Sequence, residues 1–84
     1  MSYYCYILQS QRDGSYYVGS TGNLKERIAR HNRGRSVYTR SKGPWKLVYS
    51  EEHRDRAHAM ERERDIKKRK SKAYIEELVR TSRP

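Results

Sequence analysis

The first part of the chain shows apolar residues alternating between two faces. Within 4–8, two tyrosines and a leucine fall on one face of an extended segment, and Cys5 and Ile7 fall on the other. The dipeptide Asp13-Gly14 is a turn signal, and a second tyrosine-rich run ends at Gly19. The pattern therefore predicts a β-hairpin.

A helix is signalled directly after this hairpin. Ser20, Thr21 and Asn23 can each cap it, and Asn23 with Glu26 has the spacing of a capping box. A glycine at position 34 is a typical stop signal. We expect a helix from Leu24 to Asn32.

Two polar residues of this helix lie near its apolar face. Leu24 and Ile28 define that face, and Arg27 and His31 fall within about 60° of Leu24 at the helical spacing of about 100° per residue. A purely solvated role would place them on the opposite side. Arg27 and His31 are therefore predicted to border the core.

The remaining pattern predicts a short strand and two helices. Pro44-Trp45 leads into a strand over 46–49, which we expect to pair with the hairpin, with Trp45 as a core or edge anchor. A helix is predicted from about Asp55 to Lys70, and a last helix starts at Ser71. The fold class is therefore α+β, with a three-stranded antiparallel sheet flanked by helices.

One carboxylate lies on the apolar stripe of the longer helix. Ala59, Met60 and Ile66 form this stripe, and Glu63 lies in its middle. Burying an unpaired carboxylate costs several kcal/mol, so Glu63 must be paired, protonated or bound to a metal. A structural salt bridge to Arg27 is the main alternative to a functional role.

Composition limits the number of domains and the class of partner. The 84 residues suffice for one domain, expected over 1–80, with a frayed tail over 81–84. Only 33% of the residues are hydrophobic and eight are Tyr, so the core must rely on tyrosines whose hydroxyls need partners or line a site. The net charge of +10 favours a protein that binds nucleic acid over a basic domain whose charge serves only solubility.

Other partners and compartments are disfavoured. A membrane surface is disfavoured because no predicted helix combines a charged face with bulky apolar anchors. Cys5 is the only cysteine, which excludes an intramolecular disulfide, and its place in a strand favours an inert buried thiol. Because no apolar run approaches the length of a membrane span or a signal peptide, we expect a cytoplasmic protein.

Two short tyrosine motifs precede the first helix. They are Tyr4-Cys5-Tyr6 and Tyr17-Val18-Gly19, and the helix that follows carries Arg27 and then His31. In this order they resemble the GIY-YIG nuclease family. The first motif departs from the family name, because Tyr and Cys stand where Gly and Ile are commonest, and keeps the last Tyr. Small stand-alone members of this family resemble the present sequence along essentially its whole length.

The later part of the resemblance supplies an acidic residue. It covers Pro44 to Tyr49 and Glu63 to Lys67, and Glu63 is the glutamate that the family pattern requires. The resemblance implies an endonuclease that hydrolyses phosphodiester bonds with one divalent ion. Glu63 would ligate Mg²⁺ or Mn²⁺, and Arg27 would hold the phosphate with its planar guanidinium.

Three further residues have expected roles at the same site. The resemblance implies that Tyr17 activates or positions the attacking water, with Tyr6 beside it. His31 would assist proton transfer or bond the phosphate. A phenol with an unperturbed pKa of about 10 is a poor base at neutral pH, so such a site must be electropositive.

The segment from Arg33 to Gly43 reads as a basic loop. It is either a solvated connection or an arm that contacts phosphates and stacks on an unpaired base. The candidate nucleic-acid-binding residues are Arg33, Arg35, Tyr38, Arg40 and Lys42.

Three functions remain open at this point. The expected one is a metal-dependent endonuclease acting on DNA, with structure-specific or repair-related substrates such as branched or damaged DNA. The first alternative is a basic nucleic-acid-binding module of the same fold with little or no catalysis. The second is an adaptor that recognises an acidic protein partner. Neither sequence specificity nor the oligomeric state follows from the sequence.

Overall fold

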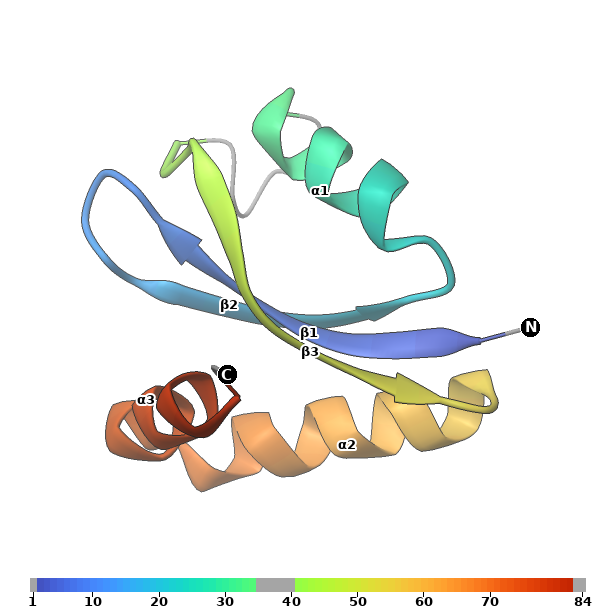
Figure 1. Cartoon of the computed structure of the whole chain (residues 1–84). Coiled ribbons are helices and arrows are strands. Elements are labelled where there is room, and N and C mark those ends of the chain that lie inside the picture. The colour runs from blue at the N-terminus through green and yellow to red at the C-terminus, as the bar shows by residue number, and fades with distance from the viewer. Residues whose placement is uncertain (1, 35–40, 83–84) are drawn as a thin grey trace.

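A computed structural model of the chain describes residues 2–34 and 41–82. Its elements in chain order are β1 (Tyr3–Ser10), β2 (Tyr16–Thr21), α1 (Leu24–Asn32), β3 (Trp45–His53), α2 (Arg56–Arg69) and α3 (Lys72–Thr81). The three strands form one sheet in the order β2-β1-β3, with both neighbouring pairs antiparallel. The predicted α+β class with a three-stranded antiparallel sheet is confirmed (Figure 1).

The sheet separates two small cores. Helix α1 lies on one side of it, and α2 and α3 lie on the other (Figure 1). On the α2 and α3 side, Cys5 and Ile7 pack with Ile66 of α2. On the α1 side, Tyr6 and Leu8 pack with Trp45 and with partly buried residues of α1. The alternating residues of β1 therefore contribute to both cores, one from each face of the strand.

The predicted starts of all three helices are confirmed. In each case the capping side chain accepts a hydrogen bond from a backbone N–H of the first turn. Asn23 accepts from Glu26 at 3.1 Å, Asp55 from His58 at 2.8 Å, and Ser71 from Tyr74 at 3.1 Å. Such caps each stabilise a helix by about 1 kcal/mol.

Three details differ from the sequence-based expectations. Strand β2 continues past Gly19 to Thr21 because Gly19 and the two residues after it still pair with β1. Strand β3 is likewise longer than predicted and reaches His53. Met60 does not belong to the buried stripe: it is 36% exposed, because Ala59 and Ile66 set the direction in which α2 faces the sheet.

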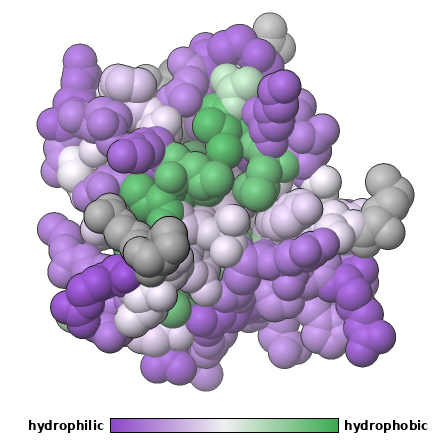
Figure 2. All heavy atoms as spheres, in the orientation of Figure 1, coloured by the Kyte–Doolittle hydropathy of each residue, from purple (hydrophilic) through white to green (hydrophobic). Residues whose placement is uncertain are grey.

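The surface is predominantly polar. Hydrophilic residues cover most of the face seen in Figure 2 and surround one central band of hydrophobic residues. The Cys5 thiol is fully buried, and burial raises its pKa to about 12, which agrees with the expected inert role. No helix within 2–34 and 41–82 is long and apolar enough to cross a membrane.

Candidate functional site

A buried pair of side chains lies between β1 and α1. Tyr6 is 0% exposed, and its hydroxyl lies 3.2 Å from Nε2 of His31, which is also buried. Burial, followed by the charges of Arg27 and Arg30, lowers the pKa of His31, and burial raises that of Tyr6 above its ordinary value. At neutral pH the phenol and the imidazole are therefore both uncharged and share one hydrogen bond.

Gly19 makes this pair possible. It lies opposite Tyr6 in the β1–β2 ladder. A Cβ at Gly19 would stand 2.5 Å from the hydroxyl oxygen of Tyr6 and 2.7 Å from its Cζ. The ring of Tyr6 therefore lies directly across the Gly19 backbone, and no larger residue fits unless the ring moves. Sequence reasoning treated Gly19 only as a strand end.

Tyr17 lies beside the buried pair on the same face of the sheet. Its ring centroid is 4.8 Å from that of His31 and 6.4 Å from that of Tyr6. Trp45 packs against it at 6.4 Å in an edge-on arrangement. Unlike Tyr6, Tyr17 is only half-buried. Of the two tyrosines, it is the one with surface available for contact with a substrate.

Arg27 lies one helical turn before His31. Its charge and a hydrogen bond act to lower the pKa of the Tyr6 hydroxyl, against the larger effect of burial. The Nε atom of Arg27 is buried and has no hydrogen-bond partner within the described part of the chain. Arg27 also lines a cleft of about 390 Å³ together with Ser20 and Arg56. An anion in this cleft would meet the positive charges of Arg27 and Arg56.

Glu63 of α2 is held by two polar contacts. Its Oε1 accepts a hydrogen bond from the Ser20 hydroxyl at 2.7 Å, and its Oε2 lies 2.6 Å from Nζ of Lys67. Its side chain is 21% exposed. Among the described residues the ion pair of Glu63 is thus with Lys67, so the alternative of a structural pair with Arg27 is wrong.

The five predicted residues approach each other from opposite sides of the sheet. Tyr6 and Tyr17 belong to the α1 side with Arg27 and His31, whereas Glu63 belongs to the α2 side. The sheet therefore divides the five residues between two cores. They gather at β2, the outer strand, where the Ser20 side chain points to α2.

Electrostatic contacts connect the two halves of the site around this strand. Nζ of Lys67 lies 5.8 Å from the Tyr17 ring centroid while it is paired with Glu63. The carboxylate of Glu63 also acts to raise the pKa of Tyr6. The site is therefore a cluster of interacting charged and polar side chains at the edge of the sheet rather than an enclosed cavity.

The donor set fits one hard divalent cation. Within the described residues, no group of three or more His, Cys, Asp or Glu side chains is placed to hold a metal. Mg²⁺, however, is commonly held by one or two carboxylates with water in the other positions. Glu63 can supply that carboxylate, and a bound cation would replace the ammonium of Lys67 beside Oε2.

The predicted nucleic-acid-binding residues are only partly described. Arg33 is exposed at the C-terminal end of α1. Lys42 lies next to the hairpin turn, with its Nζ 3.9 Å from a carboxylate oxygen of Asp13. Arg35, Tyr38 and Arg40 lie outside the described residues.

Comparisons with known proteins identify the family of the chain. The family model described as the GIY-YIG catalytic domain matches residues 2–76. A UPF0213 protein of Bacillus licheniformis is 46% identical over 83 residues, which cover 94% of this chain and 84% of the relative. A UPF0213 protein of Clostridium perfringens is 48% identical over 66 residues, covering 77% and 70%. These names state no activity.

A solved structure is also similar. The solution NMR structure of a UPF0213 protein from Bacillus halodurans matches with a TM-score of 0.59 and 36% identity. The match covers 96% of this chain and 85% of that one. The similarity therefore extends over sheet and helices alike, including the strand and the two helices that supply the site.

Proposed function

We propose a nuclease function for this chain, which belongs to the GIY-YIG catalytic-domain family. More specifically, it is a metal-dependent endonuclease that hydrolyses DNA phosphodiester bonds. The proposal rests on the convergence of two tyrosines, a histidine, an arginine and a glutamate at β2. The net charge of +10 supports a polyanionic substrate.

Arg27 is the phosphate-binding residue in this proposal. Its buried Nε and its place in a basic cleft beside Ser20 suit a planar guanidinium that receives phosphoryl oxygens. A phosphate in the cleft would form a charge-assisted contact with the Arg27 guanidinium. Arg56 lines the same cleft and adds a second positive charge.

The two tyrosines have different roles. Tyr17 is half-buried, so it positions the attacking water, and the buried imidazole of His31 packs against its ring with the centroids 4.8 Å apart. Tyr6 is completely buried and bonded to His31. It is therefore a positioning residue that orients the imidazole and does not itself contact the substrate.

Glu63 holds the divalent cation, Mg²⁺ or Mn²⁺. When bound, the ion would neutralise charge on the phosphoryl oxygens and lower the pKa of a coordinated water. The Ser20 hydroxyl fixes one carboxylate oxygen at 2.7 Å, which leaves the other to exchange Lys67 for the cation. Ser20 also lines the cleft in which Arg27 lies, so it connects the carboxylate of Glu63 with the Arg27 side of the site.

Cleavage assays test the proposal directly. Purified protein is incubated with supercoiled plasmid, branched DNA and single-stranded DNA, each with Mg²⁺, Mn²⁺ or a chelator. Glu63→Gln should abolish metal-dependent cleavage while DNA affinity persists, because lysines and arginines elsewhere supply that affinity. Glu61→Gln, an exposed glutamate on the same helix, is the matched control and should cleave normally. Cleavage by Glu63→Gln at the wild-type rate would refute the proposed role.

One observation favours a second candidate function. The ammonium of Lys67 already neutralises Glu63 at 2.6 Å, as a resident cation would. A nucleic-acid-binding module of this fold would keep that pair and need no metal. DNA binding with a steep salt dependence but no cleavage on any substrate would support the module over the enzyme.

A further inference from the structure

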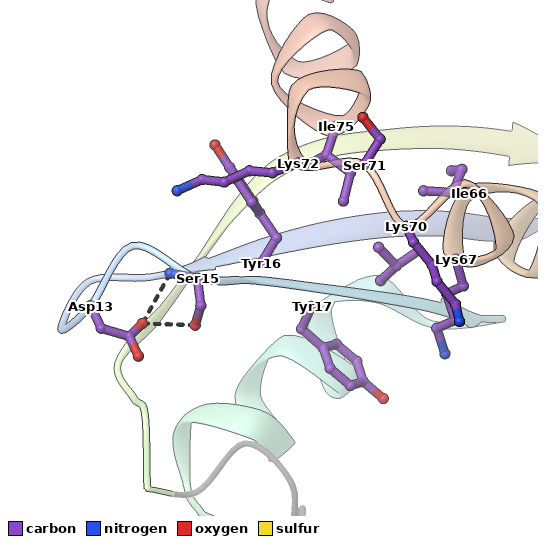
Figure 3. Close-up of a pocket in the computed structure, with 11 residues that line it drawn as sticks. Asp13, Ser15, Tyr16, Tyr17, Ile66, Lys67, Lys70, Ser71, Lys72 and Ile75 are labelled. Atoms are coloured by element: carbon purple, nitrogen blue, oxygen red, sulfur yellow. Dashed lines mark hydrogen bonds between the residues drawn. The ribbon is translucent and has the colours of Figure 1, made fainter.

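A groove of about 800 Å³ extends away from the site described above. It lies between the hairpin on one side and the junction of α2 and α3 on the other (Figure 3). Tyr17 and Lys67 line the end that adjoins the site, and Tyr16 and Lys72 line the other end. The proposed function uses the first of these pairs and leaves the rest of the groove without a role.

The groove combines an apolar floor with positive charge. Apolar and aromatic side chains, among them Tyr16, Val18 and Ile75, belong to the strand and helix that wall it. Lys70 and Lys72 line it and are both exposed. Such a combination suits single-stranded nucleic acid, whose phosphates meet the lysines while its bases lie against apolar and aromatic surface.

The negative charge in the groove is already engaged. Asp13 is the carboxylate among the lining residues, at the hairpin turn. It accepts hydrogen bonds from the backbone N–H and the hydroxyl of Ser15, at 2.9 and 2.7 Å, and lies 3.9 Å from Lys42. These contacts hold its pKa well below the usual range and partly offset its repulsion of a phosphate.

Lys70 has an unusual backbone conformation. It ends α2 with φ 47° and ψ 39°, and it is the one residue other than glycine with positive φ in the described ranges. Glycine or asparagine is the common choice at such a helix end, because a side chain there costs conformational energy. The chain accepts that cost and keeps a lysine facing the groove, which points to a use for its charge.

We propose that one DNA strand, adjacent to the phosphate being cleaved, lies in this groove with Lys70 and Lys72 contacting its backbone phosphates. The exposed lysines and the aromatic and apolar side chains that line the groove match the phosphates and unpaired bases of a single strand. The proposal rests on the proposed function, because it extends the same substrate away from the cleavage site.

The test measures binding rather than cleavage. A fluorescently labelled oligo-dT is titrated with protein in chelator, at several salt concentrations. Lys70→Asn and Lys72→Gln should each weaken binding about fivefold at 0.1 M salt, and each should reduce the salt slope by about 0.7. Lys68→Gln, which removes an exposed charge of α2 that does not line the groove, should change neither value.

Thermal unfolding excludes a folding defect as the cause. Asparagine tolerates the backbone conformation of residue 70, so Lys70→Asn should melt at the wild-type temperature or a few degrees higher. Lower affinity together with equal or higher Tm would support the groove. Equal effects of all three lysine variants, or no binding of oligo-dT by the wild type, would overturn it.

This outcome is separable from that of the proposed function. An enzyme that cleaves in a Glu63-dependent way while Lys70→Asn and Lys72→Gln bind normally would refute the groove alone. Binding that depends on Lys70 and Lys72 without any cleavage would refute the nuclease and leave the groove standing.

Discussion

The two sides of the sheet hold their functional groups in different ways. On the α1 side, Tyr6 and His31 are buried, uncharged at neutral pH and bonded to each other at 3.2 Å. On the α2 side, Glu63 and Lys67 are charged, and the Lys67 side chain is 50% exposed. The first pair depends on packing, whereas the second depends on charge that salt or a competing cation can screen.

This difference assigns different tasks to the two sides. A buried neutral pair keeps a fixed geometry, which suits orientation of a catalytic imidazole. A partly exposed ion pair contributes at most about 1 kcal/mol and can be exchanged, which suits a position that must accept a cation or a phosphate. Substitutions in the Tyr6–His31 pair should therefore mainly affect stability, and those in the Glu63–Lys67 pair mainly ligand binding.

The largest effect is expected at Gly19. Gly19→Ala places a methyl group 2.5 Å from the Tyr6 hydroxyl oxygen, so the fully buried ring of Tyr6 must shift to admit it. We expect a loss of about 3 kcal/mol in the free energy of unfolding, measured by urea denaturation. Gly22→Ala is the control, because the added methyl meets the less buried Tyr3 ring at 3.0 Å. Equal losses for both variants would contradict this account.

A smaller effect is expected from removal of the Tyr6 hydroxyl. Tyr6→Phe removes the hydrogen bond between the Tyr6 hydroxyl and Nε2 of His31, which should cost about 1–2 kcal/mol of stability. Tyr17→Phe changes a half-buried residue and should cost less stability while it reduces cleavage more. Denaturation and cleavage rates measured on both variants check the contrast, and the reverse ordering would exchange the roles of the two tyrosines.

The buried histidine should also make stability depend on pH. Burial lowers the pKa of His31 in the folded state, so the unfolded state takes up a proton first as the pH falls below about 6.5. The free energy of unfolding is therefore unaffected by this group above pH 6.5. It decreases from pH 6.5 toward pH 5, by at most about 1.4 kcal/mol per pH unit. Urea denaturation at pH 5, 6, 7 and 8 should show this decrease, and His31→Gln should reduce it.

Most of the fold could be predicted because local patterns determine it. The alternation around Cys5 and Ile7 and the caps at Asn23 and Asp55 define strands and helix starts without reference to the rest of the chain. The same holds for the inward position of His31, which follows from helical spacing alone.

The arrangement of the site could not be predicted in the same way. Periodicity identifies the buried face of α2, but it does not determine which side of the sheet that helix covers, so the position of Glu63 across the sheet from α1 could not be predicted. The role of Gly19 depends on a ring from the neighbouring strand. Only the ion pair of Glu63 with Lys67 had a sequence signal, because the two are four residues apart on one helix.

The smallest effect on stability and a clear effect on binding are expected at Lys67. Lys67→Gln removes a partly exposed ion pair and should change the free energy of unfolding by less than about 1 kcal/mol. It also removes the ammonium that occupies the position beside Oε2 of Glu63, so Mn²⁺ should bind more tightly in the absence of DNA. Lys68→Gln, with the same change of charge on the same helix, serves as control. Calorimetric titration with Mn²⁺ measures the affinity of each variant. Tighter binding in Lys67→Gln alone would identify Glu63 as an exchangeable cation site. Equal affinities in both variants would mean that the Glu63 carboxylate has a structural role, like the Tyr6–His31 pair on the other side of the sheet.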